Sequence, residues 1–325
     1  MTRPLTYYIL FLAVTSLSVA MMVLAPFSLF AQQPKVTSLT LISGTASPSS
    51  KELAQHLSRR LPELLKKPVN LKSLPSGTGV PAAGLLTQAP ADGSTLGILP
   101  LEASITRILT QSTPYLASEL TGLLILYEEP YALIASSHAP FDNLSQLAAQ
   151  AQKTPLTLGY NSPTGLSLPI LQALSVSKQM GFELKAKFSN ALTPESLIND
   201  SNIDLMLVPL SETFGLLQKG VKVVAVLADD FQRQCAPNIE SLSDLGLKIE
   251  IHNFTAIYGP AFLPLRLSAD ALDHMLDLLN TPEASAIMER GCLTRTDYNS
   301  ISSPIALAQQ YEAHKNLLKS LGMDN

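Results

Sequence analysis

The residues with the clearest potential for chemistry form small loops rich in glycine and hydroxyl groups. The loop Pro75–Gly79, PSGTG, precedes a short apolar segment that Pro81 opens as a helix. Glycine leaves backbone N–H groups approachable, and the first N–H groups of a helix have no partner within it. Such a loop can bind an anion or the oxygen of a polar solute. The same residues also make simple connecting turns, so this loop alone leaves both interpretations open.

Further loops repeat this chemistry after apolar segments that are typical of buried strands. They are Ser43–Ser50, Gly159–Gly165, Ser189–Leu192 and Pro209–Ser211. In open α/β sheets, ligands collect at the carboxyl ends of the strands, so we expect these loops to lie near one another. Their hydroxyl and N–H groups suit hydrogen bonding and not covalent chemistry.

The residue combinations that an enzyme or a metal site needs are not recognisable. The five histidines are scattered, without the spacing of a zinc site, and no nucleophile is paired with a base. Asp204 follows a strand pattern, and we interpret it as pairing a loop and not as a general base. Lys51 could attract an anion, but at a helix start it opposes the dipole, which favours simple solvent exposure. We therefore expect no catalysis, no metal and no cofactor.

Composition narrows the class of protein further. With 325 residues, 46% of them hydrophobic and 15% charged, the chain can bury a large core and form two lobes. A net charge of −4 without long charge runs, and the absence of Trp, argue against a nucleic-acid partner.

Residues 1–31 have the pattern of an export signal. Arg3 precedes an uncharged apolar run, and small residues follow at Ser28 and Ala31. The run is also long enough for an uncleaved membrane anchor. In an oxidising compartment Cys235 and Cys292 could form a disulfide, although two buried free thiols are the alternative.

The order of the predicted elements is that of an α/β fold. A strand at 36–43, a helix at 51–65 and a strand at 69–71 form a βαβ unit. The long apolar stretch 120–135, broken at Pro130, predicts a chain that leaves one lobe and enters the other. The expected C-terminal helices are 269–280, 282–289 and 304–321.

At this point the sequence resembles the tripartite tricarboxylate transporter substrate-binding receptors, the TctC or Bug family of periplasmic solute-binding proteins. The most specific landmarks are VNLKSLPSGTGVPAAGLLTQAPADGSTLGIL and CAPNIESLSDLGLKIEIHNFTAIYGPAFLP, within a similarity from about Val36 to Leu321. The resemblance implies a two-lobed periplasmic-binding-protein (Venus-flytrap) fold, each lobe a mainly parallel sheet flanked by helices. It also implies periplasmic localisation.

The resemblance implies a domain organisation and a function. The expected parts are a signal peptide at 1–31, a first lobe at 36–133 and 255–325, and a second lobe at 134–254. The lobes would capture a small organic acid or related polar metabolite and deliver it to the integral-membrane permease subunits of a tripartite transporter. The alternative is a divergent periplasmic sensor or interaction subunit that no longer serves transport.

The family's ligand loops fall on the loops described above. The implied ligand-binding residues are Ser43, Gly44, Thr45, Ala46, Ser47, Ser49, Ser50, Ser76, Gly77, Thr78, Gly79, Tyr160, Asn161, Ser162, Thr164, Gly165, Phe188, Ser189, Asn190 and Pro209. The rings of Tyr160 and Phe188 could pack either on a ligand or at the edges of the lobes.

The chain departs from the family pattern in two of these loops. The first lacks the usual glycine triplet, Pro48 removes one backbone donor, and Lys51 stands where an acidic residue is common. Asn190 and Ala191 replace paired glycines in another loop. Side-chain hydroxyls would have to replace the missing backbone donors.

Overall fold

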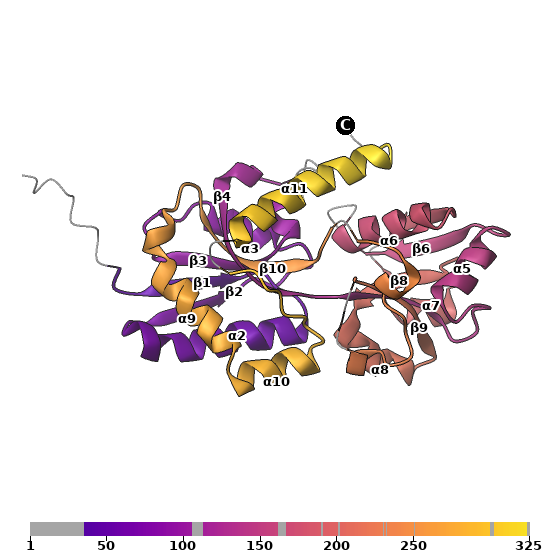
Figure 1. The fold of residues 1–325 in the computed structure, drawn as a ribbon, viewed down its shortest axis with the longest axis horizontal. Coiled ribbons are helices and arrows are strands. Elements are labelled where there is room, and N and C mark those ends of the chain that lie inside the picture. The colour runs from indigo at the N-terminus through magenta and orange to yellow at the C-terminus, as the bar shows by residue number, and fades with distance from the viewer. Residues whose placement is uncertain are drawn as a thin grey trace, which may run out of the picture. The chain divides into compact units, whose positions relative to one another are not determined.

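The computed structural model describes residues 36–105, 113–161, 167–189, 191–200, 202–229, 231, 233–249, 251–299 and 302–323. The expected signal peptide at 1–31 lies outside these residues. The described chain forms two five-stranded sheets, each flanked by helices (Figure 1). None of its helices is both long enough and apolar enough to cross a membrane.

The first sheet has the strand order β2-β1-β3-β10-β4. Its strands are β1 (Leu39–Ser43), β2 (Val69–Ser73), β3 (Thr95–Pro100), β4 (Leu120–Glu128) and β10 (Phe254–Pro260). Strand β1 pairs in parallel with β2 and β3, whereas β10 pairs antiparallel with both β3 and β4. The sheet is therefore mixed, with β10 as its reversed strand, and the carboxyl ends of the other four strands share one edge.

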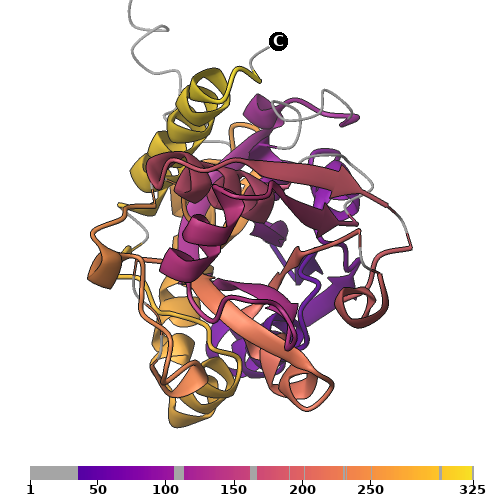
Figure 2. The ribbon, with the colours of Figure 1, turned by 90° about the vertical axis from the view of Figure 1, so that its right-hand side faces the viewer.

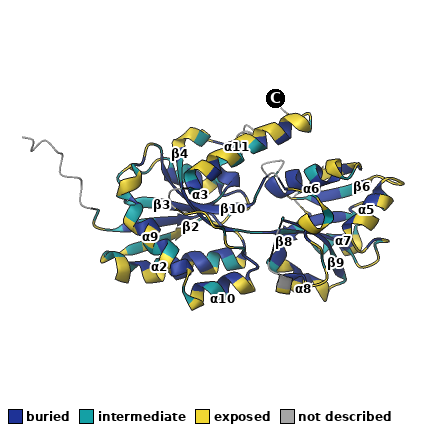
Figure 3. Cartoon of the chain, viewed as in Figure 1, coloured by how far each residue is buried: buried dark blue, intermediate teal, exposed yellow. Residues whose placement is uncertain are grey.

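Helices cover both faces of this sheet. Helices α2 (Pro48–Leu65), α9 (Ala269–Leu279) and α10 (Pro282–Arg290) lie on one face, and α3 (Val80–Leu86) and α11 (Ser303–Ser320) on the other (Figure 1). Leu53, Leu57 and Leu61 of α2 recur at helical spacing and pack in one core with Leu39 and Leu41 of β1. Figure 3 shows the result, buried strands between helices whose outer faces are exposed.

The second sheet has the order β7-β6-β8-β5-β9. Its strands are β5 (Tyr131–Ser136), β6 (Leu156–Tyr160), β7 (Leu184–Phe188), β8 (Leu205–Pro209) and β9 (Val221–Leu227). Here β5 is the reversed strand, antiparallel to β8 and β9. Its helices are α5 (Leu144–Ala151), α6 (Leu168–Gln179), α7 (Ser196–Asn199) and α8 (Thr213–Leu217), seen from the right-hand side of Figure 1 in Figure 2.

Short 3₁₀ turns complete the described elements. They are η2 (Ala117–Glu119), η3 (Leu210–Glu212), η4 (Arg233–Cys235), η5 (Ser243–Leu245) and η6 (Leu265–Leu267).

The side chain of Asp204 accepts a hydrogen bond from the Thr157 N–H at 2.7 Å, so it pairs a loop to β6.

The chain crosses between the sheets at two places, and the two crossing segments are bonded to each other. The first crossing runs from β4 through Glu129 and Pro130 into β5. The N–H of Glu129 donates to the carbonyl of Asn253 at 3.0 Å, and the Asn253 side chain returns a 2.8 Å bond to the carbonyl of Glu129. These reciprocal bonds hold the crossings side by side.

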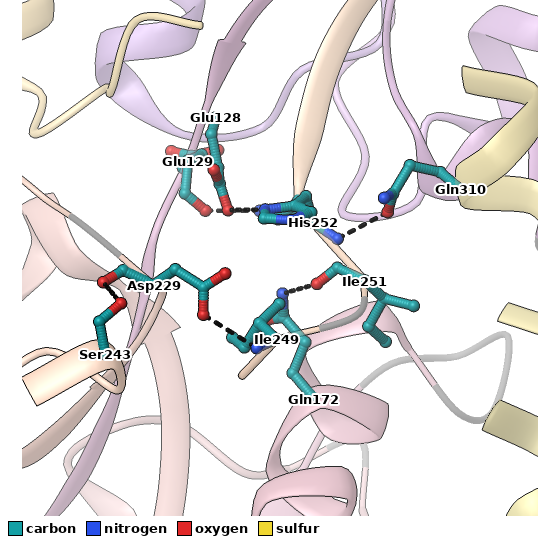
Figure 4. A network of polar contacts seen from close by, with 10 residues as sticks. Glu128, Glu129, Gln172, Asp229, Ser243, Ile249, Ile251, His252 and Gln310 are labelled. Atoms are coloured by element: carbon teal, nitrogen blue, oxygen red, sulfur yellow. Dashed lines mark hydrogen bonds and ion pairs between the residues drawn. The ribbon is translucent and has the colours of Figure 1, made fainter. Parts of the chain in front are cut away.

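A polar network surrounds these crossings (Figure 4). His252 lies between Glu128 and Gln310 of α11. The Glu128 carboxylate is 3.0 Å from the ring Nδ1, and the Gln310 side-chain oxygen accepts a hydrogen bond of 2.8 Å from the backbone N–H of His252. Burial lowers the pKa of His252, but the hydrogen bond to Glu128 and the charges of Glu128 and Asp229 outweigh it and leave the pKa raised. The network therefore ties α11 to the second crossing.

A disulfide joins Cys235 and Cys292, with an S–S distance of 2.11 Å. Cys235 ends η4, which follows β9 of the second sheet, and Cys292 follows α10 of the first. Two residues further on, Thr294 exchanges backbone hydrogen bonds with Glu128 at the end of β4. The disulfide thus fixes the chain close to the crossings.

We predict that the double variant Cys235→Ala/Cys292→Ala lowers the free energy of unfolding by about 2–5 kcal/mol, because the bond closes a long loop in the unfolded chain. The sequence separation of the two cysteines is 57 residues. Guanidinium denaturation of the oxidised protein and the variant measures the difference. Equal midpoints and slopes would show that the bond contributes nothing to stability.

Candidate functional site

A cavity of about 390 Å³ lies between the two sheets and is lined by residues of both. This volume lies within the range of about 300–1,000 Å³ that is usual for sites of small ligands. The first sheet contributes the loops after β1, β2 and β3, and the second contributes the end of β6, the start of α6 and the end of β8. The crossings contribute Glu129, Tyr131 and Asn253.

The structure brings part of the expected ligand set to this cavity. The lining includes Thr45, Ala46, Ser47, Ser76, Gly77, Thr78, Tyr160, Asn161 and Pro209. It does not include Ser43, Gly44, Ser49, Ser50, Gly79, Phe188 or Ser189. Ser162, Thr164, Gly165 and Asn190 lie outside the described residues. Contact of any of these residues with a ligand stays a prediction.

Residues that do not line the cavity shape the loops that do. The Gly44 N–H donates to the carbonyl of Ile98 at 3.0 Å, and the Ser76 N–H donates to the carbonyl of Gly44 at 3.2 Å. The Ser43 and Thr45 hydroxyls are 3.0 Å apart and share a hydrogen bond. The loops after β1 and β2 are therefore held together as one surface.

Gly79 has a positional role of the same kind. Its φ of +69° is in the left-handed region, and a Cβ there would come within 2.7 Å of Pro100 Cδ. Its N–H donates to the Ser76 hydroxyl at 2.8 Å. Gly79 thus positions Ser76 and does not itself reach the cavity.

On the second sheet, the predicted polar and aromatic residues hold each other. The Asn161 side chain donates to the carbonyl of Leu192 at 2.9 Å, which ties the loop after β6 to the loop after β7. The rings of Tyr160 and Phe188 are 5.6 Å apart and tilted. Only Tyr160 lines the cavity, while the side chain of Phe188 is exposed outside it.

Three glutamates that the sequence analysis did not select also line the cavity, namely Glu102, Glu129 and Glu212. Glu102, directly after β3, is 4% exposed. Burial raises its pKa to about 8, although a hydrogen bond from the Leu168 N–H at the start of α6 lowers it. This carboxyl group therefore reaches from the first sheet to the first turn of a helix of the second.

Glu129 lies in the first crossing, opposite the start of α2. Burial raises its pKa to about 7, the hydroxyls of Ser47 and Ser50 lower it, and the charge of Glu212 raises it. Among the described residues, its buried Oε1 has no hydrogen-bond partner. This carboxyl oxygen therefore has an unused capacity to accept a hydrogen bond.

Glu212 ends η3 at the rim of the cavity, where its side chain is exposed to solvent. The protein around its carboxylate still desolvates it and raises its pKa, while the charge of Lys51 lowers it. No Lys, Arg or His is found among the lining residues of the described chain, and the same part of the chain has no cluster of side chains that could hold a metal ion.

For two of these glutamates, Glu102 and Glu129, the sequence contained a usable signal. Glu102 directly follows the apolar run LGILPL, and Glu128 and Glu129 stand immediately before Pro130, where the apolar stretch 120–135 breaks. The signal was an acidic residue at the end of a buried strand. That these carboxyl groups lie close to the first turns of helices could not be predicted, because it depends on the packing of distant segments.

The sequence also matches a family model. The model describes the tripartite tricarboxylate transporter family receptor, TctC, and it matches residues 53–322. The chain belongs to this family. Its members are solute-binding receptors with the periplasmic binding-protein fold. A search of curated proteins gives no match.

Solved structures show that the fold of this TctC receptor is shared. BugD, a periplasmic binding protein, has a TM-score of 0.70 at 17% identity, over 88% of this chain and 98% of that chain. MatC from Rhodopseudomonas palustris with bound malate has a TM-score of 0.66 at 17% identity, over 87% and 98%. Rpa4515 of R. palustris with adipate has a TM-score of 0.71 at 15% identity, over 88% and 98%. These similarities confirm the two-lobed α/β fold.

For this TctC receptor we predict that Glu102→Gln becomes more stable relative to the wild type as the pH rises. The pKa of about 8 in the folded state lies above the ordinary value of 4.5, so the folded state holds its proton where the unfolded chain has lost it. Wild-type stability should therefore fall as the pH rises from about 4.5 to about 8. The difference between the two proteins should change by about 2.5 kcal/mol between pH 5 and pH 7.

Denaturant unfolding at both pH values measures this change. Glu63→Gln, which removes the same charge from an exposed position of α2, is the matched control and should run parallel to the wild type. Parallel curves for Glu102→Gln as well would contradict the raised pKa.

Proposed function

We propose that this protein is a periplasmic receptor that captures a small polar solute between its lobes and delivers it to the permease subunits of a tripartite tricarboxylate-type membrane transporter. The observation that carries the proposal is the cavity, which is lined by strand ends of both sheets. A molecule that fills it contacts both sheets at once. Membership of the receptor family and the ligands in similar structures support the same function.

The proposal includes movement about the crossings. We take the first lobe as 36–133 with 255–325 and the second as 134–254. A solute that contacts both lobes binds the closed arrangement more tightly and so increases its population. The paired segments at Glu129 and Asn253 are the natural hinge, since two bonded strands can bend together more easily than they can separate. Closure would then signal the loaded state to the permease.

Binding without turnover is part of the proposal. The carboxyl groups of the cavity could act as acids or bases, but the lining offers neither a nucleophile held by a base nor a metal site among the described residues. The cavity instead offers hydroxyls, backbone groups and carboxyls from several segments. Whether the cavity prefers a positively or a negatively charged solute depends on those carboxyl groups.

We predict that Ala46→Trp abolishes solute binding, because Ala46 lines the cavity and an indole there would occupy space that the solute needs. Calorimetry against a broad panel of acids, amines and amino acids measures binding, and small-angle scattering with and without the solute measures closure. Ala91→Trp, at an exposed turn outside the lining, is the matched control and should bind as the wild type does. If nothing in the panel binds the wild type, the receptor function is wrong.

A further inference from the structure

The cavity walls carry acidic side chains from separate segments of the chain. Glu102, Glu129 and Glu212 come from three separate segments, and none of the described lining residues is basic. Lys51 is the cation whose charge acts on Glu212, yet it is not part of the lining. A dicarboxylate entering this cavity would meet carboxyl groups without a compensating positive side chain.

A carboxyl group of the protein lies close to each of two helix starts at the cavity. Ser47 and Ser167, both in the lining, are the N-caps of α2, with 18 residues, and α6, with 12. Glu102 accepts a hydrogen bond from the N–H of Leu168, the first residue of α6, and the hydroxyls of Ser47 and Ser50 act on Glu129 at the start of α2. At α6 the position that could receive a ligand's anion is thus taken by Glu102, and at α2 the Ser47 hydroxyl caps the Ser50 N–H while Glu129 lies close to these hydroxyls.

We propose that the solute of this receptor carries a cationic nitrogen, a primary ammonium or a guanidinium group, which is held by the carboxylates of Glu102 and Glu129. The proposal rests on the receptor function above and specifies its substrate class. Charge-assisted hydrogen bonds from nitrogen to carboxylate are among the strongest available to a small ligand. Oε1 of Glu129 is buried without a hydrogen-bond partner among the described residues, so a bond to the ligand would satisfy it.

The other walls fit the rest of such a molecule. A cavity of about 390 Å³ accommodates a chain of a few methylene groups between two polar ends. Met206, Val208 and Ile170 give it apolar surface, and Tyr131 belongs to the same lining. Aromatic rings are suitable neighbours for a cation.

Proton release gives the proposal a second, independent signature. The charged and titratable groups around the two carboxyls are Glu212 on η3, Tyr131 on β5, Tyr127 on β4 and Lys51 on α2. With pKa values of about 8 and about 7, Glu102 and Glu129 are largely protonated in the empty cavity at pH 6. A cation favours the ionised forms, so its binding should release protons and strengthen as the pH rises.

The experiment compares putrescine and adipate, which share a spacer of four methylene groups and differ in the charge of their ends. Isothermal titration calorimetry of the purified protein at pH 6 and pH 8, in two buffers of different ionisation enthalpy, reports affinity and proton exchange together. Agmatine tests the guanidinium group, and malate is the second acid. We expect the amines to bind, with at least about tenfold higher affinity at pH 8 and with proton release.

Variants assign the effect to the two carboxyl groups. Glu102→Gln and Glu129→Gln keep the size of the side chain and should each weaken amine binding by about tenfold or more, because a charge-assisted bond is lost. Glu63→Gln on the exposed face of α2 should bind as the wild type does. Thermal melting shows that each variant is folded.

The outcomes separate the two proposals. If adipate or malate binds and the amines do not, the cation assignment is wrong and the receptor function stands. If the amines bind equally at both pH values and tolerate both Gln variants, the assignment to Glu102 and Glu129 is wrong. If neither the amines nor the acids bind, the cation assignment is wrong, and the broad panel then decides the receptor function.

Discussion

The interaction on which this structure depends most is the hydrogen bond between the Leu168 N–H and the carboxyl group of Glu102. Its donor is at the first turn of α6 beside the second sheet, and its acceptor directly follows β3 of the first sheet. A polar group that is 4% exposed needs a partner, since an unsatisfied buried carboxyl is costly. This bond therefore satisfies a buried group, spans the cavity and sets the charge of its wall at the same time.

The surrounding structure explains how such a cavity can be both shaped and adjustable. Each loop of the first sheet is tied down by its neighbours, as the bonds of Gly44 and Gly79 show. In the described chain, the connections to the second sheet include the two bonded crossings, the disulfide, the bond from Leu168 to Glu102, and α11, whose Gln310 bonds to the second crossing. Rigid walls joined by a narrow, paired connection are what a receptor needs if a small solute is to change its conformation.

Much of the fold could be predicted from the sequence, because hydrophobic spacing reports on local structure. Helices α9, α10 and α11 differ from the predicted helices by about one residue at their ends. The long stretch at 120–135 divides between two sheets, as its break at Pro130 indicated.

The site was less predictable, because its composition depends on contacts between distant segments. Thr45, Ser76 and Tyr160 line the cavity, and their positions in small-residue loops or at the end of a strand had predicted them as site residues. Glu102 and Glu129 were missed because an acidic residue after a strand is usually solvated. Only the packing of the helices shows that the carboxyl groups of these two residues are shielded from solvent. Phe188 was expected at the ligand and lies outside the lining, since its ring packs beside Tyr160.

The most direct test of this account is a crystal structure of the protein grown with putrescine at pH 8. The account predicts electron density in the cavity between the two sheets, with a nitrogen of the ligand within about 3 Å of carboxylate oxygens of Glu102 and Glu129. A cavity filled by the protein's own side chains would contradict the receptor function. Putrescine bound away from both glutamates would contradict the assignment of its charge.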